Sequence, residues 1–298
     1  MPQTAYVYVP LPSRGNLEIG IQDGLWGWKK PTLDRSGNRG VVASLQAGDF
    51  LLLGYGGPNS RVAPGGWQHA RIKRVVVGQV IRPLYTSTSV VWPDDAYPER
   101  IGLEILGDYP DVSGLSPDGM EALRLSANKQ GAAVKDLGTE ALFALAATDP
   151  RDDDTPTSEA DGAEAETDAL RSVFVRREQA RLRRLKFGGA EEIKCAICRR
   201  TLPARIVHAA HIKRRAAAGY TERMDPANIM GACTLGCDSL FEFGFIYVDR
   251  DGLIRVGPTV PRSLAAVASD LAGELCGAFC AASADYFEYH RAEIANVG

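Results

Sequence analysis

Residues 195–245 read CAICRRTLPARIVHAAHIKRRAAAGYTERMDPANIMGACTLGCDSLFEFGF, and they carry the strongest structural signal in the chain. The stretch holds two close cysteine pairs, Cys195 with Cys198 and Cys233 with Cys237. Each pair can form one knuckle of a tetrahedral zinc site. Six cysteines in 298 residues are too few for a disulfide scaffold. We therefore predict one structural zinc ion bound by these four cysteines.

Three further polar residues stand in order within the same stretch. His211 stands in the segment HAAHI, Asn228 in DPANIM, and Asp238 directly after the last cysteine. The order CxxC, AHI, N, CxxxCDxLF resembles the HNH nuclease family over about residues 175–256. The resemblance implies a zinc-stabilised ββα-metal fold and the hydrolysis of phosphodiester bonds.

The resemblance also implies a role for each of these residues. His211 would be the general base, because a neutral imidazole takes up a proton near pH 7. Asn228 would orient the imidazole or brace the loop. Asp238 occupies the helix position where such nucleases usually place a histidine, and a carboxylate there suits a catalytic Mg²⁺ or Mn²⁺ ion.

One expected metal ligand is missing from this pattern. Many members of the family carry an acid or a histidine immediately before the base, where this chain has Ala210. His208 is the candidate replacement. Residues 208 and 211 face opposite sides of a regular strand, so we expect His208 to join the site only if the strand bulges or bends. The alternative is a histidine on the surface, or one that contacts the ligands of the site without binding the metal.

Charge is unevenly distributed, although the formal net charge is only −3. Residues 149–168 hold nine acidic residues and one basic residue, with little that can be buried, which predicts a flexible acidic linker. Residues 170–225 hold fifteen basic and five acidic residues, which favours a phosphate-binding surface over a merely solvated helix face. The predicted domains are residues 1–147, a linker over 148–169, and residues 170–298.

The N-terminal domain is predicted to be rich in β-structure. Alternating or β-branched runs predict strands at Ala5–Val9, Asp49–Leu53, Ala70–Val80 and Ile101–Leu106. From Ser116 to Ala147 the apolar spacing becomes helical. Short strands joined by Gly, Pro and Asn loops suggest a small barrel or strongly bent sheet with flanking helices, so the fold class of the whole chain is α+β.

Aromatic side chains gather in this first domain, which contains all four tryptophans. The candidates for binding a flat ligand are Trp26, Trp67, Tyr85 and Trp92, although each could equally fill the core of a small β-domain. The segments AYVYVPL, IGIQDGLWGW, LQAGDFLLLGYGGP, RVVVGQVIRPLY and SVVWPDDAYPERIGLEIL together resemble the EVE domains of the PUA-like superfamily over about residues 5–106. That resemblance implies a bent β-barrel that holds a flipped, modified cytosine in an aromatic pocket.

The two halves together predict a modification-dependent DNA endonuclease that acts on double-stranded DNA carrying modified cytosine. The alternatives are a catalytically inactive, zinc-stabilised nucleic-acid-binding protein and a PUA-like nuclease directed at RNA. An apolar helix predicted over Ser263–Phe287 offers a face for a homodimer or for the domain's own core. With no membrane segment and no leader in the sequence, we expect no membrane partner and a cytoplasmic protein.

Overall fold

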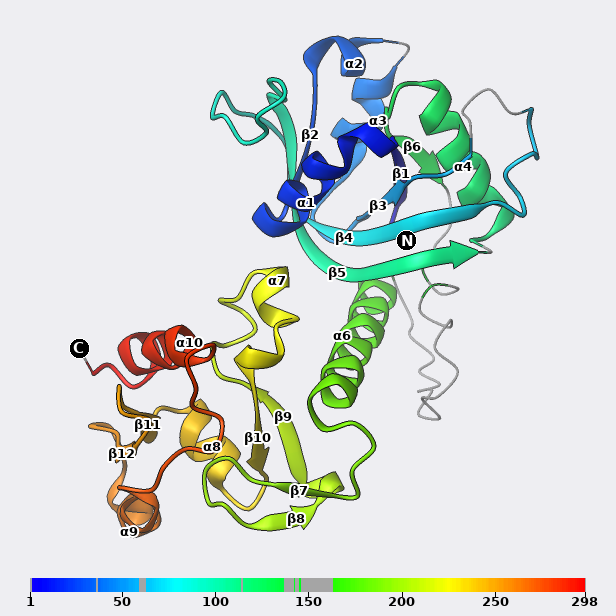
Figure 1. Cartoon of the computed structure of the whole chain (residues 1–298). Coiled ribbons are helices and arrows are strands. Elements are labelled where there is room, and N and C mark those ends of the chain that lie inside the picture. The colour runs from blue at the N-terminus through cyan, green and yellow to red at the C-terminus, as the bar shows by residue number, and fades with distance from the viewer. Residues whose placement is uncertain are drawn as a thin grey trace. The chain divides into compact units, whose positions relative to one another are not determined.

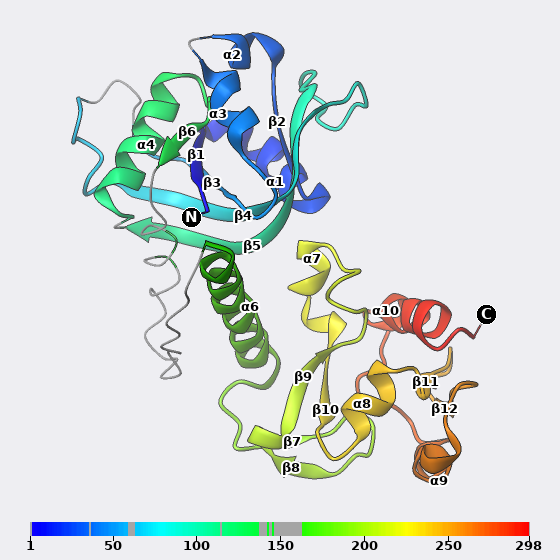
Figure 2. The ribbon, with the colours of Figure 1, turned by 180° about the vertical axis from the view of Figure 1, so that it is seen from behind.

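The computed structural model describes residues 2–35, 37–58, 63–113, 115–136, 142, 145 and 163–297. The chain is a mixed α+β protein of two compact units, Met1–Arg177 and Glu178–Gly298 (Figure 1, Figure 2). Their boundary falls inside helix α6 (Ala163–Phe187), later than the predicted domain start at residue 170. Of the predicted linker, residues 148–162 lie outside the described residues, and 163–169 begin α6. Within the described part of the chain, no helix has the length and apolarity needed to cross a bilayer.

The first unit is built on one six-stranded sheet with strand order β2-β5-β4-β3-β1-β6. Its elements in chain order are β1 (Thr4–Val9), α1 (Arg14–Asp23), β2 (Leu25–Trp28), α2 (Lys30–Asp34), α3 (Asn38–Ser44), β3 (Phe50–Tyr55), β4 (Arg71–Thr86), β5 (Glu99–Ser113), α4 (Pro117–Asn128) and β6 (Val134–Asp136). Strands β1 and β3 run parallel, and the other neighbouring strands are antiparallel. The four strands predicted from the sequence fall in β1, β3, β4 and β5.

The sheet curls into a half-barrel, which confirms the predicted bent sheet at this coarse level (Figure 1). The curvature lies mainly in β4 and β5, which are 16 and 15 residues long. Their pairing shifts register at Val77/Gly78, Val80/Arg82 and Arg82/Tyr85. Such bulges bend a strand and increase its twist, so the long hairpin wraps round instead of lying flat.

The predicted helical run from Ser116 to Ala147 is correct only in its first part. Ser116 caps α4 by accepting a hydrogen bond from the backbone N–H of Gly119 at 3.2 Å. The helix ends at Asn128, because Gln130 and Gly131 adopt left-handed φ values of 56° and 79°. The chain then forms β6, which pairs with β1. Most of residues 137–147 lie outside the described residues.

The second unit contains three two-stranded sheets and short helices. Its elements after α6 are β7 (Glu192–Lys194), β8 (Thr201–Pro203), β9 (Val207–His211), α7 (Tyr220–Arg223), β10 (Ile229–Cys233), α8 (Cys237–Glu242), β11 (Ile246–Val248), β12 (Ile254–Val256), α9 (Arg262–Leu271) and α10 (Ala284–Tyr289). Strands β9 and β10 are antiparallel, and α8 begins four residues after β10 ends. Strand β9 and helix α8 of this ββα arrangement both contribute residues to the pocket described below.

The single helix predicted over Ser263–Phe287 is wrong. Helix α9 stops at Leu271, and Gly273 adopts a left-handed φ of 87°. The backbone that follows bonds to β12 instead of continuing a helix: Gly273 donates to the Ile254 carbonyl, and Ile254 donates to the carbonyl of Glu274. The predicted homodimer therefore loses the continuous apolar face on which it depended, and it stays a prediction.

Candidate functional site

The four cysteines predicted to bind zinc come together in the second unit. Cys195 and Cys198 follow β7, Cys233 ends β10, and Cys237 begins α8. Their sulfur atoms lie within 4.8 Å of one another, and the Sγ atoms of Cys198 and Cys233 are 3.8 Å apart. Zn–S bonds of about 2.3 Å in a tetrahedron place sulfur atoms about 3.8 Å apart, so the cluster fits a zinc ion.

The chemistry of the cluster also suits a metal. A hydrogen bond from the Cys237 thiol, supported by backbone N–H groups, lowers the pKa of Cys195 to about 4. This shift favours the thiolate, which is the form that binds zinc. Cys276, which is buried, and Cys280, which is exposed, take no part in the cluster.

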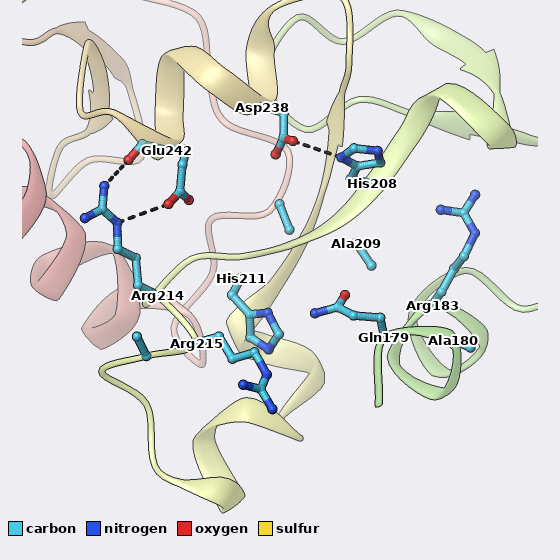
Figure 3. Close-up of a pocket in the computed structure, with 12 residues that line it drawn as sticks. Gln179, Ala180, Arg183, His208, Ala209, His211, Arg214, Arg215, Asp238 and Glu242 are labelled. Atoms are coloured by element: carbon cyan, nitrogen blue, oxygen red, sulfur yellow. Dashed lines mark hydrogen bonds and ion pairs between the residues drawn. The ribbon is translucent and has the colours of Figure 1, made fainter. Parts of the chain in front are cut away.

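His208 and Asp238 meet on the surface of the same unit. The Nδ1 atom of His208 on β9 lies 2.9 Å from a carboxylate oxygen of Asp238 in the first turn of α8 (Figure 3). The β9–β10 register runs unbroken from Val207 to His211, so no bulge was needed for this approach. The pair offers one imidazole nitrogen and one carboxylate to a divalent cation. Two protein ligands leave the remaining positions for water and phosphate oxygens, as is common for Mg²⁺.

His211 lies three residues further along β9, with its imidazole half-buried. Its Nε2 atom is 3.0 Å from the backbone carbonyl oxygen of Arg223. A carbonyl can only accept, so Nε2 carries the proton and the neutral ring keeps its lone pair on Nδ1. Burial lowers the pKa of His211, which keeps the ring neutral at pH 7. These properties are those of a general base acting through Nδ1.

Asn228 is completely buried and braces the chain between β9 and β10. Its Oδ1 accepts from the backbone N–H of Lys213 at 2.8 Å, and its Nδ2 donates to the carbonyl of Glu222 at 2.9 Å. The Lys213 ammonium also bonds both carboxylate oxygens of Glu222, at 2.7 and 2.8 Å. Of the two roles expected from the sequence, these contacts match the bracing of the loop. The loop in turn places the Arg223 carbonyl that receives His211.

A pocket of about 600 Å³ brings the three candidate catalytic and metal-binding side chains to one place. His208, His211 and Asp238 all line it (Figure 3). The other polar residues of its wall belong to no motif that could be recognised in the sequence; they are Gln179, Arg183, Arg214, Arg215 and Glu242. The density of Lys and Arg between residues 170 and 225 was the signal that pointed to the three arginines among them.

Two of these arginines are anchored to neighbouring elements. Arg183 on α6 donates to the carbonyls of Ala204 and Val207, so it supports the start of β9. Arg214 forms an ion pair with Glu242 on α8, with 3.2 Å between the Nε and carboxylate oxygen atoms. The pocket thus combines a neutral imidazole, an imidazole–carboxylate pair that could hold a divalent cation, and fixed positive charge, which are the kinds of group that the hydrolysis of a phosphate ester requires.

An aromatic pocket of about 160 Å³ lies in the first unit. Its wall includes Trp26, Trp28, Trp92 and Tyr97. The rings of Trp26 and Trp92 meet edge to face at 6.3 Å, and those of Trp92 and Tyr97 at 5.1 Å. The indole N–H of Trp92 donates to the carbonyl of Asn16, whereas that of Trp26 is buried with no hydrogen-bond partner among the described residues. A buried donor without a partner is costly, so a ligand acceptor here would be stabilising.

The other two aromatic candidates lie elsewhere. Trp67 is buried in the core of the first unit, where its ring packs edge to face on Tyr8 at 5.5 Å. Tyr85 stacks beneath the guanidinium of Arg82, 3.6 Å from the ring centre. Neither lines the aromatic pocket. Comparison with protein-family models and with curated proteins gives no match to this chain, so a function must be inferred from these two pockets.

Proposed function

We propose that this protein is an HNH-type endonuclease whose second unit cleaves DNA and whose first unit reads a modified base. The observation that carries the nuclease assignment is the convergence of His208, Asp238 and His211 on one basic pocket. The order of motifs in the sequence resembles that of the ββα-metal nucleases, and the positions of these three side chains suit the reaction that such nucleases catalyse. The two observations support the same assignment. The cysteine cluster supports the assignment by tying the ends of β10 and α8 together.

His211 would start the reaction by removing a proton from the attacking water at Nδ1. The water oxygen forms its bond to phosphorus as the bond to the leaving oxygen breaks, and the leaving oxygen takes a proton from solvent. Nε2–H stays bonded to the Arg223 carbonyl throughout, so the ring does not rotate as its charge changes. A divalent cation held by His208 and Asp238 would neutralise charge on the phosphate and on the leaving oxygen.

The basic wall of the pocket would bind the substrate backbone. Arg183 and Arg214 line it and are held by contacts within the unit, so their positive charge is preorganised for a phosphate. Such contacts are independent of base sequence. Selectivity must therefore come from another part of the chain.

The aromatic pocket of the first unit is our candidate for that selectivity. We propose that the unit is PUA-like, of the EVE type, and that the pocket accepts a base taken out of the duplex. Its aromatic walls suit the faces of a planar ring, and the unpaired Trp26 N–H suits an acceptor on its edge. Trp26 and Trp92 stay candidates for base binding, while the position of Trp67 in the core favours packing as its role.

A cleavage assay tests the function as a whole. Duplexes containing cytosine, 5-methylcytosine, 5-hydroxymethylcytosine or its glucosylated form are incubated with the zinc-loaded protein, with and without Mg²⁺ or Mn²⁺. We expect metal-dependent cleavage of at least one modified duplex and little cleavage of the unmodified one. Binding without cleavage under all conditions would identify an inactive binding protein. Preferred cleavage of a structured RNA included in the panel would identify an RNA-directed nuclease.

Substitution of Trp26 by alanine tests the reader. Loss of a base contact in the pocket should weaken binding of the modified duplex by about 1–3 kcal/mol, or roughly 5- to 150-fold, and should affect unmodified DNA much less. Competition binding of the full-length protein measures the ratio of its affinities for modified and unmodified DNA, and thermal unfolding checks that the variant is folded. Tyr85→Ala, outside the pocket, is the matched control. An unchanged preference for modified DNA in the Trp26→Ala variant would refute the assignment of this pocket.

A further inference from the structure

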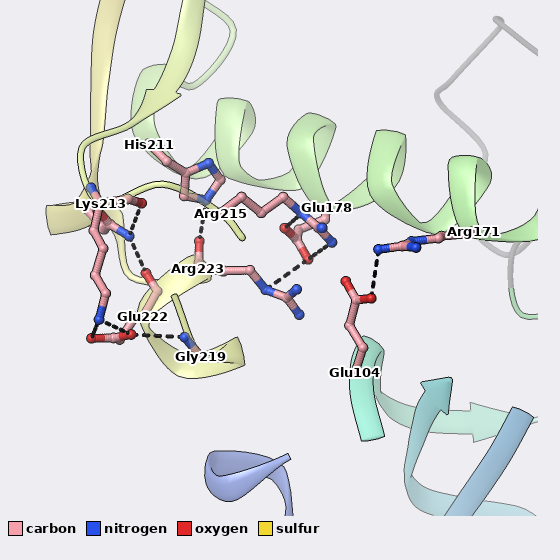
Figure 4. Close-up of polar contacts among 10 residues, drawn as sticks. Glu104, Arg171, Glu178, His211, Lys213, Arg215, Gly219, Glu222 and Arg223 are labelled. Atoms are coloured by element: carbon pink, nitrogen blue, oxygen red, sulfur yellow. Dashed lines mark hydrogen bonds and ion pairs between the residues drawn. The ribbon is translucent and has the colours of Figure 1, made fainter. Parts of the chain in front are cut away.

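A buried carboxylate lies behind the candidate nuclease site, within the most basic part of the chain. The Glu178 side chain on α6 is only 2% exposed. Its Oε1 accepts a hydrogen bond from Nε of Arg215 at 2.9 Å, and its Oε2 lies 3.8 Å from Nε of Arg223 (Figure 4). The three groups form an Arg–Glu–Arg cluster with a net charge of +1.

Stability alone is a weak reason to bury such a cluster. Removing an ion from water costs several kcal/mol, and apolar residues of similar volume often stabilise a protein as well or better. The Arg–Glu–Arg cluster connects three elements, because Glu178 on α6 pairs with Arg215 in the loop after β9 and with Arg223 on α7.

The cluster contacts His211 through Arg223. The Arg223 guanidinium pairs with Glu178, while its backbone carbonyl receives Nε2–H of His211. Helix α7 is only four residues long, so its own hydrogen bonds give it little stability. Side-chain contacts must therefore hold the carbonyl in place. Arg215, the other partner of Glu178, lines the pocket beside His211.

We propose that Glu178 is a positioning residue of the nuclease site, which orients His211 through Arg223 and balances the positive charge that His211 gains when it takes a proton. This role presupposes the nuclease function proposed above. As the water O–H bond breaks and Nδ1–H forms, the imidazole becomes a cation among several arginines. A fixed negative charge in the same cluster offsets that repulsion.

The charges around His211 show why one carboxylate matters. The charged and titratable groups that share the pocket with His211 are Arg183 on α6, Arg214 and Arg215 after β9, Asp238 and Glu242 on α8, and His208 on its own strand. Glu178 on α6 and Arg223 on α7, which lie outside the lining of the pocket, also act on the pKa of His211. Glu178 raises the pKa of His211, whereas Arg215 and Arg223 lower it. Without the charge of Glu178, Arg215 and Arg223 would lower the pKa of His211 further.

Glu178→Gln tests the role, because it keeps the shape and the acceptor atom while removing the charge. We expect kcat on modified DNA to fall roughly tenfold or more, with KM little changed, because the base is affected and the binding surface is not. Glu288→Gln, which removes the charge from another carboxylate–arginine pair of the same unit, is the matched control and should keep full activity. Unchanged kcat in Glu178→Gln would overturn the proposal.

A nitrogen NMR titration of the histidines in the zinc-loaded, magnesium-free protein provides a readout that does not need turnover. We expect His211 in the wild type to carry its proton on Nε2, and Glu178→Gln to lower the pKa of His211. Glu178→Asp keeps the charge, so the pKa of His211 in this variant should lie close to the wild-type value, and its kcat should lie between those of Glu178→Gln and the wild type. A wild-type proton on Nδ1, or the same pKa in wild type and Glu178→Gln, would refute the role. A protein that passes this test yet cleaves no nucleic acid would instead refute the nuclease function.

Discussion

His211→Ala is expected to reduce the rate of DNA cleavage by about 10²- to 10⁴-fold, the usual contribution of a general base. The substitution removes the proton acceptor that the Arg223 carbonyl positions, but it leaves the cysteine cluster and the basic wall intact. DNA affinity and zinc content should therefore stay close to those of the wild type. Single-turnover cleavage at saturating Mg²⁺, with binding measured in parallel, separates the chemical step from substrate binding.

Two controls make this result specific. His69→Ala removes an exposed histidine of the first unit and should cleave like the wild type. Asp238→Ala should also lose activity, but through the loss of a cation ligand, so raising the Mn²⁺ concentration should restore part of its rate and none of the rate of His211→Ala. Undiminished cleavage by His211→Ala would show that the base lies elsewhere.

Loss of zinc is expected to unfold residues 178–298 while the first unit stays folded. Structural zinc supplies about 10–16 kcal/mol at neutral pH, which equals or exceeds the 5–15 kcal/mol stability of a typical domain. The strands and helices of the second unit are short, and its hydrophobic core includes Cys195, Cys233 and Cys237, so loss of the ion would disrupt that core directly. Cys233→Ser, or treatment with a strong chelator, should have the same effect as removing the ion.

The positions of the tryptophans allow the two units to be followed separately. All four lie in the first unit, so tryptophan fluorescence should stay native while limited proteolysis shows the second unit to be accessible. Cys280→Ser is the control, because this cysteine is exposed and outside the cluster. Elemental analysis should find one zinc ion per chain. A folded second unit that contains no zinc would contradict the assignment.

Local spacing in the sequence was sufficient to predict the features that depend on local backbone geometry. Cysteines three and four residues apart can share an ion through one turn, so both pairs could be recognised without knowing the fold. Alternating or β-branched apolar residues predicted β1, β3, β4 and β5 for the same reason, because strand geometry has a period of two. The predicted helix over Ser263–Phe287 is wrong, because apolar spacing carries no information about where a helix is interrupted. The helix ends before Gly273, and the backbone that follows forms hydrogen bonds with β12.

The composition of each pocket was decided by the tertiary structure. Asp238 reaches His208 across thirty residues of chain, and Glu178 reaches Arg223 across forty-five, distances over which spacing carries no information about contact. The same holds for Tyr97 and Trp28, which line the aromatic pocket, and for Trp67, which does not. Whether an aromatic ring walls a cavity or fills a core depends on which elements pack against it. The sequence by itself therefore determined the kinds of chemical group available, and the packing of distant segments decided which of them meet.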